Sequence, residues 1–257
     1  MRDYVFGEGL SEEETELNMA LVTFVDPLSY EEAVKSYKWR EAMDAEIQSI
    51  QKNKTWSLTK LPAGAKKIGV KWIYKTKLNE FVEVDKFKAR LVAKGYTQQY
   101  GVDYTEVFAP VARIDIVRMI IALAAQRNWP IYQLDVKSSF LHGELSEDVF
   151  VEQPKVYEQK EGGHKVYKLH KALYGLKQAH RAWFSRIKAH FTHEGFQKCI
   201  NEQTLFVKQI SRGKILIVSV YVNDLIFTGD DKQVMLEFKK SMMKVFDMTD
   251  LGKMGFF

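Results

Sequence analysis

Two aspartates in distant parts of the sequence could together bind a divalent cation. Asp224 follows Asn223 within residues 215–230, an apolar stretch rich in β-branched residues. This pattern predicts a β-hairpin that carries Asn223 and Asp224 at its tip. Asp135 is an isolated carboxylate within a second apolar stretch, residues 133–136. Mg²⁺ prefers hard oxygen ligands, so the two carboxylates together indicate a magnesium site, whereas either one alone is more typical of an ordinary turn.

The composition is that of a folded protein with a reduced cysteine. A chain of 257 residues that is 46% hydrophobic can form one large domain or two small domains with a core. The single cysteine, Cys199, excludes an internal disulfide framework and a metal cluster built on thiolates. No apolar run has the length of a membrane span, and no signal-peptide pattern is present. We therefore expect a soluble intracellular protein, cytoplasmic or nuclear, with no membrane partner.

Charge is distributed unevenly along the chain. Residues 1–36 contain nine acidic residues against Arg2 and Lys35, a net charge of −7. The net charge of the whole chain is +5, so the remaining residues together carry +12. We interpret residues 1–36 as an acidic linker outside the fold. Residues 52–94 contain twelve Lys or Arg against three acids, a local net charge of +9. Such a concentration favours a polyanionic partner, although a solvated lysine-rich surface explains the charge equally simply.

Hydrophobic periodicity predicts elements that could position these residues. A helix is expected from Ser36, with a buried face, and three basic strands follow at about 56–61, 68–78 and 81–91. Asp115 is a plausible N-cap for a helix that ends near residues 128–130. A further helix should end at Gly195, and an amphipathic helix is expected over residues 232–246. The buried side of that last helix is predicted to comprise Val234, Leu236, Phe238, Met242 and Val245.

Several blocks of sequence resemble a known family. The hairpin tip resembles the Tyr-x-Asp-Asp motif of reverse transcriptases. The surrounding chain, about residues 37–257, resembles the copia-type enzymes of LTR retrotransposons. The blocks that carry the resemblance recur in the family's order, and they are residues 72–75, 88–95, 108–113, 134–137 and 173–178.

The resemblance implies a fold and a set of partners. The fold would be α+β, with a right-hand polymerase palm, which is an antiparallel sheet backed by helices, and a basic β-rich fingers subdomain. Fingers would comprise about residues 37–108 and 145–172, and palm about 109–144 and 173–257. The family's thumb and ribonuclease H domains are expected to be missing from this sequence. Partners would be an RNA or DNA template with its primer, deoxynucleoside triphosphates and, in a full Pol polyprotein, integrase and ribonuclease H.

The resemblance also implies a role for each site residue. Asp135 and Asp224 would bind two Mg²⁺ or Mn²⁺ ions that promote nucleotidyl transfer. Lys88, Arg90 and Lys94 would contact the triphosphate, with exposed surface charge as the simpler alternative. Phe140 would exclude a ribose 2′-hydroxyl, although an aromatic there is more often core. The other expected contacts are backbone N–H groups near Ser138 and Ser139 for phosphate oxygens, Gly175, Lys177 and Gln178 near the template, and Tyr221 beside the aspartates.

Asn223 is the main departure from the family, which has a catalytic aspartate at this position. An amide oxygen can coordinate Mg²⁺, but the side chain is neutral and its N–H donors repel a cation. We estimate that the change costs about 3 to 6 kcal/mol of transition-state stabilisation. Other departures are His180 at a usual proline, Val82 at a usual glycine, and Lys155 and Val156 in a turn that usually resembles proline-glycine. A β-branched residue is costly where φ must be positive.

Three functions follow from these observations. The first is an RNA-directed DNA polymerase domain that uses two metal ions and is impaired by Asn223. The second is a catalytically dead transposon remnant that still binds nucleic acid. The third is a transposon fragment with no cellular role. Primer extension by the unaltered chain would separate the first function from the second.

Overall fold

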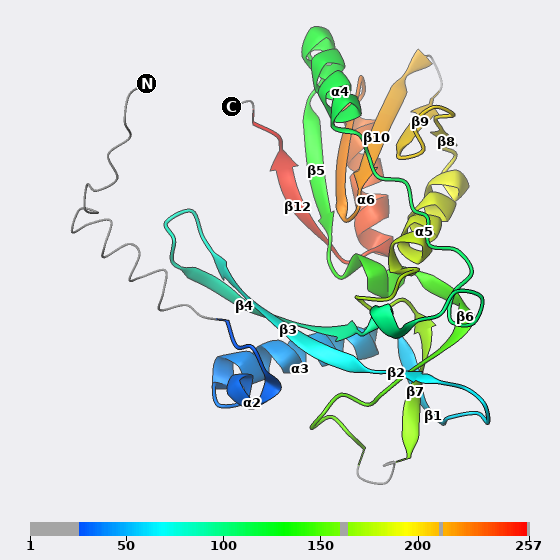
Figure 1. Cartoon of the computed structure of the whole chain (residues 1–257). Helices are drawn as coiled ribbons and strands as arrows, with labels where there is room; N and C mark the ends of the chain where they lie inside the picture. Colours follow the sequence, from blue (N-terminus) through cyan, green and yellow to red (C-terminus); the bar gives the residue numbers. More distant parts are fainter. Residues whose placement is uncertain (1–25, 160–163, 211–212, 256–257) are drawn as a thin grey trace, which may run out of the picture. The chain divides into compact units, whose positions relative to one another are not determined.

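The computed structural model describes residues 26–159, 164–210 and 213–255 (Figure 1), and these form two compact units. Of these described residues, the first unit combines 26–46 with 72–90, and the second combines 47–71 with those from 91 to 255. Most of the predicted acidic linker, residues 1–25, lies outside the described residues. The rest of that segment includes the short helix α2 (Tyr30–Ala33), which Ser29 caps through its hydroxyl.

The first unit is a β-ribbon packed on a helix. Strands β3 (Val70–Leu78) and β4 (Val84–Ala93) pair with each other, as two of the predicted basic strands. Helix α3 (Tyr37–Lys52) supplies Trp39, whose ring centroid lies 5.3 Å from that of Tyr74 and 4.9 Å from that of Phe87. These aromatic contacts bury one face of the ribbon, and the lysines of β3 and β4 occupy positions that alternate with the aromatic residues.

The second unit contains a small four-stranded sheet. Its strand order is β1–β7–β6–β2, where β2 runs parallel to β6 and the other pairs are antiparallel. The bounds are β1 (Trp56–Lys60), β2 (Lys67–Ile68), β6 (Glu144–Val151) and β7 (Lys165–Lys171). Trp56 stacks on Tyr167 across the β1–β7 pair, with ring centroids 4.1 Å apart. The predicted strand at residues 56–61 is confirmed, but it pairs with β7 rather than with β3 or β4.

A six-stranded antiparallel sheet carries the predicted hairpin. Its order is β12–β5–β11–β10–β9–β8, so β5 lies beside β11. The bounds are β5 (Ile131–Val136), β8 (Gln197–Lys198), β9 (Leu205–Gln209), β10 (Ile215–Tyr221), β11 (Asp224–Gly229) and β12 (Met248–Lys253). Three helices accompany this sheet, namely α4 (Ile114–Arg127), α5 (Ala179–His193) and α6 (Lys232–Val245). The α+β prediction is therefore confirmed.

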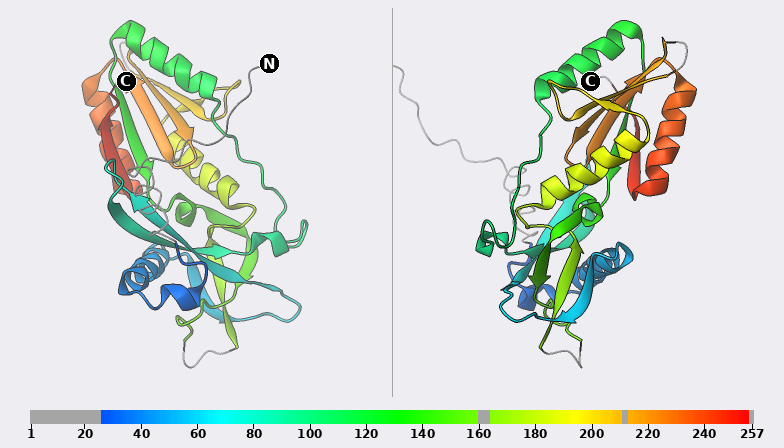
Figure 2. Two further views of the ribbon diagram at one scale, coloured as in Figure 1. Left: turned by 60° about the vertical axis from the view of Figure 1, so that its left-hand side comes forward. Right: turned by 90° about the vertical axis from the view of Figure 1, so that its right-hand side faces the viewer.

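Helices cover both faces of the six-stranded sheet. Ile226 packs with Ile120 and Ala124 of α4, whereas its neighbour Phe227 lies 5.1 Å from Phe238 of α6, measured between ring centroids. Because side chains alternate along a strand, successive residues of β11 point to opposite faces. Helix α4 therefore covers one face, and α5 and α6 cover the other (Figure 2). We call these the α4 face and the α5–α6 face.

Two details of the predicted helices are wrong. Helix α4 begins at Ile114, so Asp115 lies in its first turn and pairs with Arg118 at 3.5 Å instead of capping the helix. In α6 the buried residues are Met235, Phe238 and Met242, whereas Leu236 and Val245 are exposed. The apolar side of α6 is narrower than the predicted one, because only this stripe reaches the sheet.

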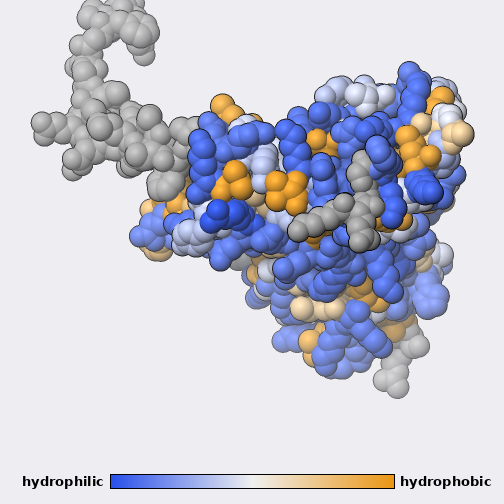
Figure 3. Space-filling view, turned by 90° about the horizontal axis from the view of Figure 1, so that it is seen from below, coloured by the Kyte–Doolittle hydropathy of each residue, from blue (hydrophilic) through white to orange (hydrophobic). Residues whose placement is uncertain are grey.

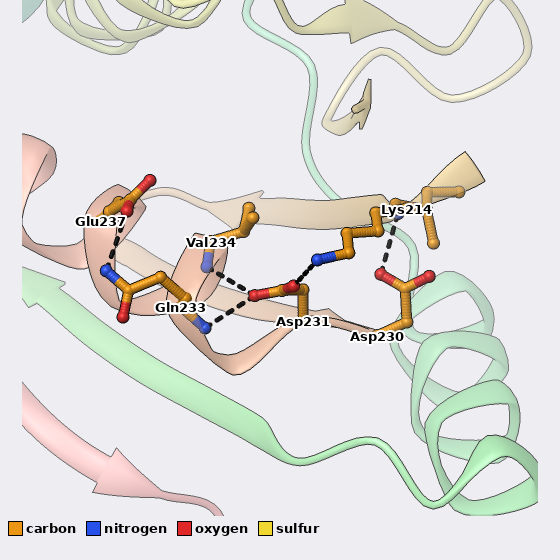
Figure 4. A network of polar contacts seen from close by, with 7 residues as sticks. Lys214, Asp230, Asp231, Gln233, Val234 and Glu237 are labelled. Atoms are coloured by element: carbon orange, nitrogen blue, oxygen red, sulfur yellow. Dashed lines mark hydrogen bonds and ion pairs between the residues drawn. The ribbon is translucent and has the colours of Figure 1, made fainter. Parts of the chain in front are cut away.

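A polar network fixes the start of α6 after the hairpin (Figure 4). One carboxylate oxygen of Asp231 accepts hydrogen bonds from the backbone N–H groups of Gln233 and Val234, at 2.8 and 3.1 Å. Its other oxygen pairs with the Lys214 ammonium group. Asp230 accepts a hydrogen bond from the Ile215 N–H at 3.0 Å. These contacts tie the open end of the hairpin to the helix that backs it.

No helix among the described residues combines the length and the apolar character that a bilayer span requires. Hydrophilic residues also cover most of the face drawn in Figure 3, where hydrophobic residues form only small scattered groups.

Candidate active site

Asp135 and Asp224 lie directly opposite each other on adjacent strands. Asp224 of β11 is the register partner of Asp135 of β5. The next pair, Val136 and Asn223, is joined by a backbone hydrogen bond of 2.9 Å from the Val136 N–H to the Asn223 carbonyl. The two aspartates therefore occupy a non-hydrogen-bonded position of the antiparallel ladder, where facing side chains approach most closely. The sequence prediction that these carboxylates converge is confirmed in this register.

Both carboxylates belong to the α4 face and are half-buried. Gln133 and Tyr221 share that face by strand alternation, since Tyr221 also pairs with Asp224 in the β10–β11 register. Burial raises the pKa of the Asp224 carboxyl group, and the negative charge of Asp135 raises it further. A side-chain hydrogen bond with Gln133 acts in the opposite direction on the same pKa. Two acids this close repel each other unless a cation or a proton lies between them.

Asn223 contacts the aspartate across the strand. Its side-chain amide N–H donates a hydrogen bond to an oxygen of Asp135. This contact satisfies one carboxylate oxygen without any cation. In this conformation the amide presents its donor, not its oxygen, toward Asp135, so the amide competes with a cation for the same oxygen.

The hairpin tip is a two-residue turn held by a tryptophan. Val222 and Asn223 form the turn, and Val222 has a φ of 55°, a costly value for a β-branched residue. The indole N–H of Trp183 on α5 donates a hydrogen bond of 2.5 Å to the Val222 carbonyl. Sequence reasoning did not connect Trp183 with the hairpin. No sequence signal marks this role, because the contact joins segments 39 residues apart.

The segment after β5 is a buried 3₁₀ turn. Ser139 and Phe140 are only 2% and 7% exposed, and the turn spans Ser139–His142. Ser138 precedes the turn with a φ of 49°. The Phe140 ring packs against those of Tyr174 and His180, with centroids 4.7 and 4.6 Å apart. Phe140 is therefore held in place by aromatic contacts.

The Gly175–Gln178 segment packs on another part of its own unit. A Cβ on Gly175 would lie 2.2 Å from the Ala93 carbonyl oxygen, so only glycine allows this approach. Buried Gln178 accepts a hydrogen bond from Gln98 at 3.0 Å and donates one to the Asp103 carbonyl at 2.9 Å. Exposed Lys177 lies 4.9 Å from the ring centroid of Tyr104. Within this unit, the glycine and the glutamine hold two chain segments together.

The predicted phosphate-binding cations lie along β4 and just beyond it. Lys88 and Arg90 belong to the first unit and share a strand face with Lys86. Burial lowers the pKa of Lys88, and the charges of Arg90 and Lys86 lower it further. Lys94 belongs to the second unit, where its backbone N–H donates to the Gly69 carbonyl at 2.8 Å. Lys86, Lys88 and Arg90 thus form one row of positive charge.

Both predicted valine anomalies are present in the structure. Val82 has a φ of 63° and Val156 a φ of 71°, so each β-branched residue occupies the left-handed region. This confirms the expectation that a β-branched residue occupies a positive-φ position at both turns where the sequence departs from the family. Each valine carries a backbone cost that a glycine would avoid.

A sequence model of the family described as reverse transcriptase (RNA-dependent DNA polymerase) matches residues 53–257. The chain belongs to the reverse transcriptase family. It is 39% identical over 212 residues to the Retrovirus-related Pol polyprotein from transposon TNT 1-94 of Nicotiana tabacum, covering 82% of this chain and 16% of that relative. It is also 38% identical over 243 residues to the transposon RE1 polyprotein of Arabidopsis thaliana, covering 94% of this chain and 16% of that relative.

The resemblance to retrotransposon reverse transcriptases is therefore confirmed, and we use the word palm for the six-stranded sheet with its helices. The chain spans 16% of the length of these curated relatives. Among solved structures it is similar to a foamy viral protease-reverse transcriptase in complex with double-stranded DNA. That similarity has 13% identity and a TM-score of 0.36, and it covers 82% of this chain and 29% of the other.

Proposed function

We propose that the chain is the fingers and palm part of an RNA-directed DNA polymerase whose chemistry is impaired by Asn223. The observation that carries the proposal is the register that sets Asp224 opposite Asp135 on one sheet face. In this proposal the fingers comprise about residues 37–108 and 145–172, and the palm about 109–144 and 173–257. The substrates would be deoxynucleoside triphosphates and a primer on an RNA or DNA template.

The donor set suits magnesium, though weakly. Mg²⁺ is commonly held by one or two carboxylates, with water and substrate phosphates completing its octahedral shell. Asp135 and Asp224 would supply those carboxylates. No group of three or more His, Cys, Asp or Glu able to hold a metal occurs among the described residues. When bound, the metal would neutralise phosphate charge and favour ionisation of the primer 3′-hydroxyl.

Trp183, Phe140 and the cations of β4 each have a role in this proposal. Trp183 holds the hairpin tip, and so keeps Asp224 in register with Asp135. Phe140 is braced by Tyr174 and His180, so it could limit the space beside a sugar. The row of Lys86, Lys88 and Arg90 would bind triphosphate oxygens, because guanidinium and ammonium groups pair with phosphate.

Asn223 supports a second candidate function, a remnant that binds nucleic acid without chemistry. Its amide already satisfies an Asp135 oxygen, which weakens the case for a bound metal. Under this alternative the basic ribbon would still bind a primer-template duplex through its phosphates. That binding should weaken steeply with salt, because it releases counterions.

Primer extension separates the two functions. The unaltered chain, Asn223→Asp and the double variant Asp135→Asn with Asp224→Asn should be assayed with Mg²⁺ and with Mn²⁺, alongside primer-template binding. The polymerase proposal predicts slow extension by the unaltered chain, faster extension by Asn223→Asp and none by the double variant. Duplex binding by all three proteins with extension by none would contradict it and favour the remnant.

A further inference from the structure

A positively charged pocket lies behind the palm sheet, on the face opposite to the two aspartates. Its volume is about 650 Å³, and all its lining residues belong to the second unit. Met248 lines the pocket and pairs in register with Val136. Val136 follows Asp135 on β5, so its side chain points to the face opposite to that of Asp135. Phe246, also in the lining, packs on Trp183 of α5, with ring centroids 5.5 Å apart. The pocket therefore adjoins the α5–α6 face.

The lining of this pocket has an excess of positive charge. It contains two acidic residues, of which Asp247 already pairs with Lys52 at 3.2 Å and with Lys137 at 3.3 Å. Only Glu144 remains to offset the other four cations. None of these four forms an ion pair within 4.0 Å of an acid among the described residues. They are Lys54, Lys171, Arg186 and Lys244.

Three of these cations come from different elements and converge. Lys54 follows α3, Lys171 ends β7, and Arg186 lies on α5 above the Phe246 ring, 5.6 Å from its centroid. Burial lowers the pKa of Lys171, the charge of its register partner Glu144 raises it, and the nearby charges of Arg186 and Lys54 lower it. Like charges placed together in a half-buried pocket are stabilised when an anion joins them.

We propose that this pocket binds a small anion that carries several phosphate groups. The guanidinium of Arg186 can bind two phosphate oxygens at once, and the lysine ammonium groups can bind others. Two aromatic rings line the pocket. Phe246 is 2% exposed, and the half-buried His142 imidazole packs on it with ring centroids 5.5 Å apart, so charged groups make up most of the accessible lining. Recognition would thus be of the phosphate groups themselves, whether they belong to inorganic polyphosphate, an inositol phosphate or a nucleoside triphosphate.

The chain offers a matched pair of variants for a binding test. The pocket variant combines Lys171→Gln with Arg186→Gln. The control combines Lys165→Gln with Lys188→Gln, which removes the same charge from β7 and α5 at two exposed positions outside the pocket. Calorimetric titration with tripolyphosphate, inositol hexakisphosphate and a deoxynucleoside triphosphate, each without divalent cations, compares the phosphate sources.

The proposal expects at least one of the three anions to bind, with a dissociation constant about tenfold or more higher in the pocket variant and little changed in the control. If the pocket variant fails to fold, Lys54→Gln with Lys244→Gln removes two exposed lining charges instead. Absence of binding, or equal weakening in both variants, would overturn it. A titration of the same variants with duplex DNA is the remaining arm. Weakening by the pocket variant that is confined to duplex DNA would also overturn the proposal, because it would make the pocket part of a nucleic-acid surface.

Discussion

Two hairpins of this protein place a valine with positive φ at their tips, yet different contacts hold them. In the β10–β11 hairpin of the palm, the Val222 carbonyl binds the Trp183 indole, and the Asn223 carbonyl binds the Val136 N–H. In the β3–β4 ribbon, the turn that contains Val82 is closed from within. The Asn79 side-chain oxygen accepts from the Phe81 and Glu83 N–H groups, both at 2.9 Å.

The backbone strain at the two tips has different origins. Tertiary contacts from α5 and β5 determine the palm tip, and that tip presents the candidate active site. The ribbon tip is fixed by its own residues, and Phe81 and Val82 are exposed there. Strain that persists because neighbouring elements impose it is typical of functional sites, whereas strain closed locally can be removed without affecting a site.

The largest expected effect is at the palm tip. Asn223→Asp should raise the rate of primer extension between about a hundredfold and about ten-thousandfold, because it restores a carboxylate where charge develops. Single-turnover extension with Mg²⁺ measures the effect. Asn79→Asp, the matched change in the ribbon turn, should leave the rate nearly unchanged. Equal gains from both variants would show that added negative charge, rather than its position, matters.

The second effect concerns the bond that holds the palm tip. Trp183→Phe removes the indole N–H and leaves the Val222 carbonyl without its partner, so we expect a loss of about 1 to 3 kcal/mol in the free energy of unfolding. Urea unfolding measures it. Trp129→Phe serves as the control, because the Trp129 indole makes no hydrogen bond among the described residues. A loss no larger than that of the control would show that the bond does not support the tip.

The third effect tests the strain itself. Val82→Gly should raise the free energy of unfolding of the ribbon by about 0.5 to 1 kcal/mol, since relief of the positive φ exceeds the added entropy of the unfolded chain. Val222→Gly should gain less, because half-buried Val222 also loses packing. Hydrogen exchange at the two turns measures both changes. Equal gains at the two tips would remove the distinction between them.

The smallest effect is a response to acid in the helix that backs the palm. His190 on α5 is 8% exposed with an unpartnered Nε2 atom, and burial lowers its pKa. Neutral His190 therefore contributes its full stabilisation above the unfolded-state pKa of about 6.5. This stabilisation is lost as pH falls through the lower pKa of His190 in the folded state. The unfolding temperature should drop less between pH 7 and pH 5 in His190→Gln than in the unaltered chain. Exposed His164→Gln should not change the drop.

The sequence was sufficient to predict the elements and the aspartate pair, since both depend on local patterns. Apolar runs rich in β-branched residues specified β10 and β11, and the isolated acid Asp135 at the end of another apolar run marked the partner strand. The N-cap of α4 could not be predicted, because Arg113 precedes the helix and makes no side-chain cap bond. Nor could the buried stripe of α6, which depends on where the sheet surface lies.

The site's supporting contacts were beyond sequence reasoning for a similar reason. The bond from Trp183 to Val222 and that from Gln98 to Gln178 join segments 39 and 80 residues apart. A tryptophan in a helix, as at Trp183, or a glutamine in a loop, as at Gln98, gives no sign in the sequence of such a distant partner. The roles of Lys88, Arg90, Lys94 and Phe140 toward substrate stay predictions, as does the division into fingers and palm.

Direct titration with Mn²⁺, followed by electron paramagnetic resonance, tests the central claim that Asp135 and Asp224 form a cation site weakened by Asn223. We expect weak Mn²⁺ binding by the unaltered chain, tighter binding by Asn223→Asp, and loss of that binding when both aspartates become asparagine. Identical titration curves for all three proteins would contradict it.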